Sequence, residues 1–195
     1  MILSNEVIKC ILERRSTRKF TNEQITPDHL DTLLETAIWA PTGGNNQTWL
    51  FTAIQKADVL SELSLLVRDT ARLWEPDDDY PSKLMMKKLS LNDDYNFFYH
   101  APTLIIASNR PNYQNAMADC ALALENIFLA AHSLGLGSCY INQLFWLRNE
   151  APIRDFLALH GVPKENVICN AAAIGYIAEK SAPPARKPDT IAIIR

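Results

Sequence analysis

The stretch Trp39-Ala40-Pro41-Thr42-Gly43-Gly44-Asn45-Asn46-Gln47-Thr48-Trp49 joins an apolar helix to a strand. Pro41 ends the helix, because proline disfavours the helical conformation at the residue before it and donates no backbone hydrogen bond. Gly43 and Gly44 then allow a sharp bend or a close approach of the backbone to a flat group. Three carboxamides follow, each with a donor and an acceptor on one planar group. Two interpretations stay open here: a loop that binds a planar heterocycle, and a polar connecting loop.

On either side of this stretch, the spacing of apolar residues predicts alternating helices and strands. Helices are predicted over residues 5–15, 27–38, 57–74, 82–92, 114–134 and 149–159. Strands are predicted over 50–54, 103–107 and 167–176, an extended stretch over 136–142, and an acidic, proline-bounded loop over 75–81. Thr26 and Pro27 have the residue types of a helix cap and first position.

The helix predicted over 114–134 is apolar over most of its circumference, so it is buried on several sides. In a chain of 195 residues this pattern favours a contribution to a dimer interface. The proline-rich residues 182–188 exclude regular structure, and the tail then ends in 190–194, which has the composition of a strand. We expect this tail to pair with a sheet edge, for which that of a second subunit is the candidate, because a free apolar strand would aggregate.

Composition indicates one globular domain over residues 1–195, with 48% hydrophobic and 21% charged residues. The net charge of -3 argues against a nucleic-acid partner, because such partners need a basic excess. The four cysteines are far apart in sequence and are interpreted as reduced thiols of a cytoplasmic protein: Cys10, Cys120, Cys139 and Cys169. The N-terminus lacks a signal-peptide pattern and no apolar run is long enough to span a membrane.

Arg14, Arg15 and Arg18, with Ser16 among them, place three guanidinium groups and a hydroxyl within five residues. Guanidinium groups match phosphate oxygens in bidentate fashion, so the cluster is a candidate phosphate site. The alternative is that basic residues complement the dipole of a helix C-terminus. Arg186 and Lys187 form a second cationic pair that could join the first in space. The sequence contains no dinucleotide-binding glycine fingerprint, P-loop, metal-ligand spacing of histidines or hydrolytic triad.

Four ordered blocks of this sequence together resemble the nitroreductase family of FMN-dependent oxidoreductases. The first two are the run from Arg14 to Phe20 and the run from Ala40 to Trp49. The others are residues 119–141, which end in Gly135-Leu136-Gly137-Ser138-Cys139-Tyr140-Ile141, and Ala173-Ile174-Gly175-Tyr176. The resemblance spans nearly the whole chain, and four blocks in the right order are far more specific than any one of them.

The resemblance implies an α+β fold with a central mixed sheet flanked by helices, in an intertwined homodimer that exchanges its C-terminal tails. Two FMN molecules would lie at the dimer interface. Arg14 and Ser16, with Arg15 nearby, would contact the phosphate or ribityl chain, and Arg18 would approach the pyrimidine edge. The partner chain would supply Pro41, Thr42, Gly43 and Asn45, supported by Gln47. Ser138, Cys139, Tyr140 and Ile141 would pack near the ring, and Arg186 or Lys187 would complete the phosphate site.

The activity implied is electron transfer from NADH or NADPH, by a ping-pong mechanism, to a nitroaromatic, a quinone or another small acceptor, with no catalytic side chain and no metal. Two alternatives stay open. One is a relative with other flavin chemistry, namely dehalogenation, dehydrogenation or flavin breakdown, and the other is a flavin-binding protein without efficient turnover.

The chain departs from the family's pattern at a few positions. Thr48 stands where the family usually has proline, and Asn142 stands where some members place a glutamate. Residues 57–100 match the family only weakly and are expected to cover the active site, which makes Trp74, Tyr80 and residues 95–99 candidates for substrate contacts.

Overall fold

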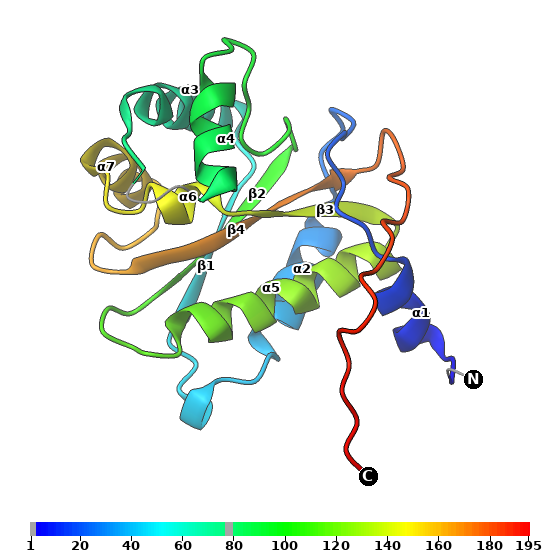
Figure 1. Ribbon diagram of the computed structural model, residues 1–195. Coiled ribbons are helices and arrows are strands. Elements are labelled where there is room, and N and C mark those ends of the chain that lie inside the picture. Colours follow the sequence, from blue (N-terminus) through cyan, green and yellow to red (C-terminus); the bar gives the residue numbers. More distant parts are fainter. Residues whose placement is uncertain (1–2, 77–79) are drawn as a thin grey trace.

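The computed structural model describes residues 3–76 and 80–195, so Asp77–Asp79 of the predicted acidic loop lie outside the described residues. The fold is α+β, as expected (Figure 1). Its helices are α1 (Glu6–Glu13), α2 (Pro27–Ile38), α3 (Ala57–Leu73), α4 (Pro81–Ser90), α5 (Ala116–Ser133), α6 (Gln143–Trp146) and α7 (Ala151–Leu159). Its strands are β1 (Trp49–Ile54), β2 (Thr103–Asn109), β3 (Leu136–Ile141) and β4 (Val167–Tyr176), and a short 3-10 turn, η1, covers Gly43–Asn45.

The strands form one sheet in the order β1-β2-β4-β3, and all three strand pairs are antiparallel. The expectation of a mixed sheet is therefore corrected for the part of the chain that the structure describes. The one parallel pairing among these residues is an isolated bridge between Ser16 and Ser138. Because β4 lies between two other strands and has helices on both faces, eight consecutive residues of it are buried, and all of these except Asn170 are apolar or glycine.

Helices cover both faces of the sheet (Figure 1). On one face, α3, α4, α6 and α7 pack over Leu104 and Ile106, and on the other, α2 and α5 pack over Ile105 and Ala107. These four residues alternate along β2, because successive side chains of a strand point to opposite faces. The result is a three-layer domain with a separate apolar core on each side of the sheet.

Side-chain caps begin α1 and α2, and the cap of α2 is the one predicted. The Asn5 side chain accepts a hydrogen bond from the backbone N–H of Ile8 at 2.9 Å, and Thr26 accepts one from that of His29 at 3.2 Å. Pro27 occupies the first turn of α2, where its missing N–H costs nothing. Helix α6, which was not predicted, has only four residues and so carries no periodic pattern.

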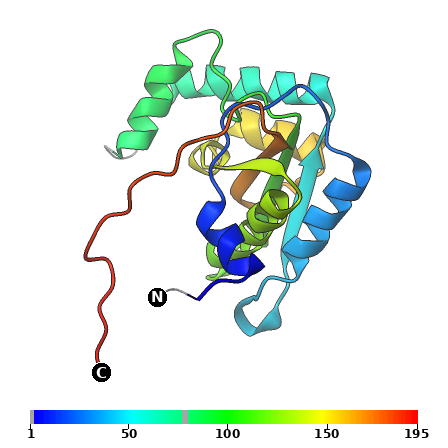
Figure 2. The ribbon, with the colours of Figure 1, turned by 90° about the vertical axis from the view of Figure 1, so that its right-hand side faces the viewer.

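The C-terminal residues 182–195 form no strand within this chain and are exposed throughout. Figure 2 shows this tail leaving the body of the domain and running away from it. Ile191, Ile193 and Ile194 are 82%, 67% and 99% exposed, so the chain itself leaves the apolar end of its tail uncovered. Among the described residues, no helix combines the length and apolar character needed to cross a membrane.

Candidate functional site

A cationic cavity of about 360 Å³ lies where the end of α1 meets the start of the tail. It is lined by Arg14, Arg15, Ser16, Arg18, Ser181, Ala182, Pro184 and Arg186. Four of these residues carry guanidinium groups, and none carries a carboxylate. The structure therefore brings Arg186 to the arginine cluster across some 170 residues of sequence, whereas Lys187 is not among the residues that line the cavity.

The guanidinium groups in this cavity are held in different ways. Arg15 Nη1 donates to the Leu12 carbonyl at 2.7 Å, which ties this side chain to the C-terminal end of α1 and supports the helix-end interpretation for Arg15. Arg14 lies over the Phe128 ring, 5.8 Å from its centroid, with its Nε 3.5 Å from a carboxylate oxygen of Glu125. The buried Nε of Arg15 has no hydrogen-bond partner among the described residues.

Strand β3 lies next to Ser16 and Arg18. The backbone N–H of Thr17 donates to the Ser138 carbonyl at 2.8 Å, beside the parallel bridge between Ser16 and Ser138. Ser138 and Cys139 are buried, and burial raises the pKa of the Cys139 thiol above its usual value, although Arg18 opposes the shift. This thiol stays protonated near neutral pH, so it acts as an apolar packing group.

A second cavity, of about 470 Å³, adjoins the first and shares Arg18 with it. We call it the aromatic cavity, because Tyr95, Phe97, Tyr99, Tyr140 and Trp146 line it. Its other lining residues come mainly from α4 and from the turn after β3: Pro81, Ser82, Met85, Met86, Leu89, Asn96, Asn142 and Gln143. The predicted variable segment, 57–100, thus supplies one wall of this cavity through α4 and residues 95–99.

Two tyrosines determine the polarity of the aromatic cavity. The Arg18 guanidinium lies 5.8 Å from the centroid of the Tyr99 ring, and a hydrogen bond to Tyr99 is the main reason why the pKa of Arg18 is raised. Burial raises the pKa of Tyr95 to about 12, while neighbouring Gln143 opposes this shift. Tyr95 is therefore a neutral phenol at physiological pH, and Arg18 is the only cation among the residues that line this cavity.

The turn of residues 41–47 lies at the far end of β1 and lines neither cavity. Gly44, Asn45 and Gln47 have φ of 62°, 54° and 48°, so the bend rests on three left-handed residues, only one of them glycine. Gln47 Nε2 donates to Asn45 Oδ1 at 2.7 Å, which joins the two side chains across the turn.

A buried carboxylate anchors this turn to α5. Asp119, which is 3% exposed, accepts hydrogen bonds from the Gly43 N–H at 3.2 and 3.3 Å and from the Tyr113 hydroxyl at 2.8 Å. The same hydroxyl lies 2.9 Å from the Gly43 carbonyl oxygen. Nothing in the sequence pattern indicated this contact, because it joins residues 76 positions apart.

The structure divides the predicted site residues into three groups, apart from Ser138, which is buried in β3, and Lys187, which lines neither cavity. Arg14, Arg15, Ser16, Arg18 and Arg186 gather at the cationic cavity, and Tyr140 lines the aromatic one. Cys139 and Ile141 belong to the core on the α3 side of the sheet. Pro41, Thr42, Gly43, Asn45 and Gln47 lie elsewhere in the same chain and line neither cavity.

The aromatic cavity also contains residues that sequence reasoning did not single out, notably Met85, Gln143 and Trp146. Of the predicted substrate contacts, Tyr95 and Tyr99 line this cavity, whereas Trp74 and Tyr80 do not. Tyr80 packs edge-on against Trp146, with ring centroids 6.4 Å apart, and so contacts a lining residue without lining the cavity itself.

Comparison with known proteins identifies the family. The model of the nitroreductase family matches residues 11–176. A nitroreductase from Bacteroides fragilis, solved with bound FMN, is 36% identical with a TM-score of 0.89 over 98% of this chain and 100% of that chain. An FMN-bound nitroreductase from Desulfitobacterium hafniense is 25% identical with a TM-score of 0.84 over 99% of this chain and 100% of that one.

Among curated relatives, the FMN reductase (NAD(P)H) of Bacillus subtilis is 26% identical over 94% of this chain and 71% of its own length. The family model covers most of the chain, and the fold agrees with that of solved members throughout. This chain belongs to the nitroreductase family.

Proposed function

We propose that the protein is an FMN-dependent oxidoreductase that transfers electrons from NADH or NADPH to a small-molecule acceptor, such as a nitroaromatic or a quinone. The observation that carries this proposal is the position of Arg18, which is shared by a cationic cavity and an aromatic one. A molecule with a phosphate at one end and a planar ring at the other matches this pair of cavities. FMN is such a molecule, and it is bound in the similar structures from B. fragilis and D. hafniense.

The cationic cavity fits the phosphate end of FMN. Its four guanidinium groups have no carboxylate among the lining residues, and Glu125, 3.5 Å from Arg14 Nε, offsets only part of their charge, so a dianion would add favourable ion pairs. Arg14, Ser16 and Arg186 would hold the phosphate. Arg15 is held by the hydrogen bond from its Nη1 to the Leu12 carbonyl, so it would attract the phosphate by its charge without changing its position.

The aromatic cavity fits the ring end. Arg18 would lie at the pyrimidine edge, where its charge favours an electron-rich ring, and Tyr99 would keep the guanidinium in place. Residues 41–47 of a partner chain would close the remaining side. The hydride acceptance and electron donation would be supplied by FMN itself, so the chain needs no acid–base pair. Met85, Leu89 and Trp146 would limit which acceptors fit.

We also propose that the protein acts as a homodimer with exchanged tails, located in the cytoplasm. Exposed apolar residues gather on α1, on the end of α2 and on the tail, and a second copy would cover them: Val7, Ile11, Leu12, Ile38, Trp39, Ile191, Ile193 and Ile194. The four cysteines are free thiols, which agrees with a reducing compartment.

The experiment that tests this function is a visible spectrum of the purified protein, recorded before and after anaerobic addition of NADH or NADPH. Flavin absorption bands that bleach support the proposal, and acceptors are then screened for reoxidation. Bands that persist after both reductants favour a flavin-binding protein without turnover. A protein that stays colourless after incubation with FMN and removal of the excess contradicts the proposal.

A further inference from the structure

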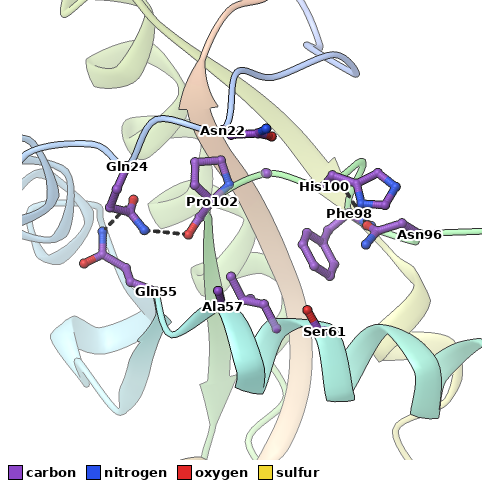
Figure 3. A pocket seen from close by; sticks show the side chains of 11 residues that line it. Asn22, Gln24, Gln55, Ala57, Ser61, Asn96, Phe98, His100 and Pro102 are labelled. Atoms are coloured by element: carbon purple, nitrogen blue, oxygen red, sulfur yellow. Dashed lines mark hydrogen bonds between the residues drawn. The ribbon is translucent and has the colours of Figure 1, made fainter.

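The loop of residues 96–100 contributes side chains to the aromatic cavity and to another cavity of about 460 Å³, here called the outer cavity, whose lining Figure 3 shows. Tyr99 lines the aromatic cavity, and Phe98 and His100 line the outer one. Asn96 lines both. The conformation of this short loop therefore determines where Tyr99 lies relative to Arg18.

The loop has an unfavourable backbone conformation. Tyr99 and His100 have φ of 60° and 55°, so two consecutive residues with a Cβ lie in the left-handed region. Such residues are uncommon and persist only where the surrounding structure stabilises them. Something in the loop must therefore stabilise this turn.

Two backbone hydrogen bonds hold this turn, from the Tyr99 N–H to the Asn96 carbonyl at 3.3 Å and from the Ala101 N–H to the Phe98 carbonyl at 3.2 Å, and the Asn96 side chain adds two more. Its Oδ1 accepts hydrogen bonds from the backbone N–H of Phe98 at 3.1 Å and from that of His100 at 3.0 Å. Figure 3 shows the carboxamide directed at the backbone beside His100, with the Phe98 ring on the other side of the loop, toward Ser61 of α3. Phe98 is 2% exposed and fixes the middle of the loop to the core.

At the other end of this arrangement, Arg18 depends on Tyr99. Among the described residues, Arg18 forms no ion pair with a carboxylate, and its ring contact is with Tyr99 at 5.8 Å. Arg14, by contrast, has Glu125 within 3.5 Å. A flexible arginine side chain that is held mainly by one ring will follow any movement of that ring.

We infer that Asn96 and Tyr99 are positioning residues that set the location of the Arg18 guanidinium, and that they thereby tune the reduction potential of the bound cofactor. The inference rests on the proposed function, because it takes Arg18 to face the pyrimidine edge of FMN. Asn96 acts by holding the left-handed turn, Tyr99 acts by holding Arg18, and neither residue needs to touch the reacting atoms.

The test measures the affinity for oxidised FMN by fluorescence quenching and the two-electron midpoint potential by anaerobic reduction with reference dyes. Asn96→Ala removes the acceptor and Tyr99→Leu removes the ring, while Asn96→Ser keeps an uncharged acceptor in reach of the same backbone. Asn92→Ala is the matched control, because Asn92 Oδ1 accepts from the Asp94 N–H at 3.0 Å in an exposed turn outside both cavities. Arg18→Ala, which removes the guanidinium group itself, gives the largest change in midpoint potential that its displacement could cause.

We expect Asn96→Ala and Tyr99→Leu to weaken binding of reduced FMN about tenfold more than binding of oxidised FMN, which lowers the midpoint potential by about 30 mV. Asn96→Ser should recover most of this loss and Asn92→Ala should leave the potential unchanged. A potential equal to that of the unsubstituted protein in both Asn96→Ala and Tyr99→Leu overturns the inference, even if thermal stability falls. If the unsubstituted protein binds no FMN, the proposed function fails as well. If it binds FMN but Asn96→Ala and Tyr99→Leu leave the midpoint potential unchanged, the positioning role fails and the proposed function stands.

Discussion

Removal of the Asp119 carboxylate tests whether the turn of residues 41–47 depends on its anchor to α5. Asp119→Ala deletes two contacts to the Gly43 N–H and one to the Tyr113 hydroxyl, all within 3.3 Å and almost out of contact with water. A hydrogen bond to a charged group contributes about 1.5–3 kcal/mol. The negative charge near the N-terminus of α5 adds about 0.3–1 kcal/mol.

Part of this stabilisation is offset by the cost of burying a carboxylate. We therefore expect Asp119→Ala to lower the free energy of unfolding by about 3 kcal/mol, in urea titrations of the FMN-free protein at fixed concentration. Asp28→Ala is the matched control, because Asp28 lies in the first turn of α2 but is exposed, so that only the dipole contribution of about 0.3–1 kcal/mol is lost.

A loss of less than 1 kcal/mol in Asp119→Ala, equal to that of the control, refutes the anchoring role. A double-mutant cycle with Tyr113→Phe refines the test, because groups in one hydrogen-bond network show coupling energies of about 0.5–3 kcal/mol. Strictly additive losses would show that the Tyr113 hydroxyl and the carboxylate act separately.

Three further predictions concern Tyr95, Gly43 and the C-terminal tail. The folded state should lose stability as the pH rises from 10 to about 12, because Tyr95 is neutral in the fold up to about pH 12 but ionises near 10 when unfolded. Tyr95→Phe should flatten this part of the stability curve by about 1.4 kcal/mol per pH unit. Gly43→Ala should destabilise the protein by about 1–3 kcal/mol in urea unfolding, because the added Cβ would lie 2.9 Å from the Tyr113 hydroxyl, which is hydrogen-bonded to Asp119. Unchanged stability would mean that this contact and the one with the exposed Asn115 side chain relax freely. Deletion of residues 188–195 should weaken self-association in sedimentation equilibrium, and an unchanged association constant would contradict tail exchange.

Much of the fold could be predicted from local chemistry. Thr26 and Pro27 marked the start of α2 because capping depends on neighbouring residues alone. The helix predicted over 114–134 is observed as Ala116–Ser133. A long apolar pattern identifies a helix well and leaves only its first and last residues uncertain. The relative direction of two strands has no comparable local signal in the sequence. The prediction of a mixed sheet was therefore wrong for the described part of the chain, whose strand pairs are all antiparallel.

The candidate site was predictable only in part, because several of its contacts join distant residues. Arg186 could be proposed as a partner of Arg14 on charge alone, but charge did not distinguish it from Lys187. The anchor of Gly43 on Asp119 depends on how α5 packs beside the turn, which no local pattern specifies. The left-handed pair Tyr99 and His100 was also missed, since neither residue type signals a positive φ as glycine would.

The strand order has a consequence for how the chain is made. Strand β4, which pairs with both β2 and β3, is the last element of the sheet to be synthesised. Until residue 176 has emerged from the ribosome, β2 and β3 lack their common neighbour, and the apolar faces of α5 and β2 lack part of their cover. Pairing of this kind across long sequence separations is slow, and it exposes unpaired edges to other chains. We therefore expect biosynthesis to be the stage at which this protein is most prone to aggregate and most dependent on chaperones.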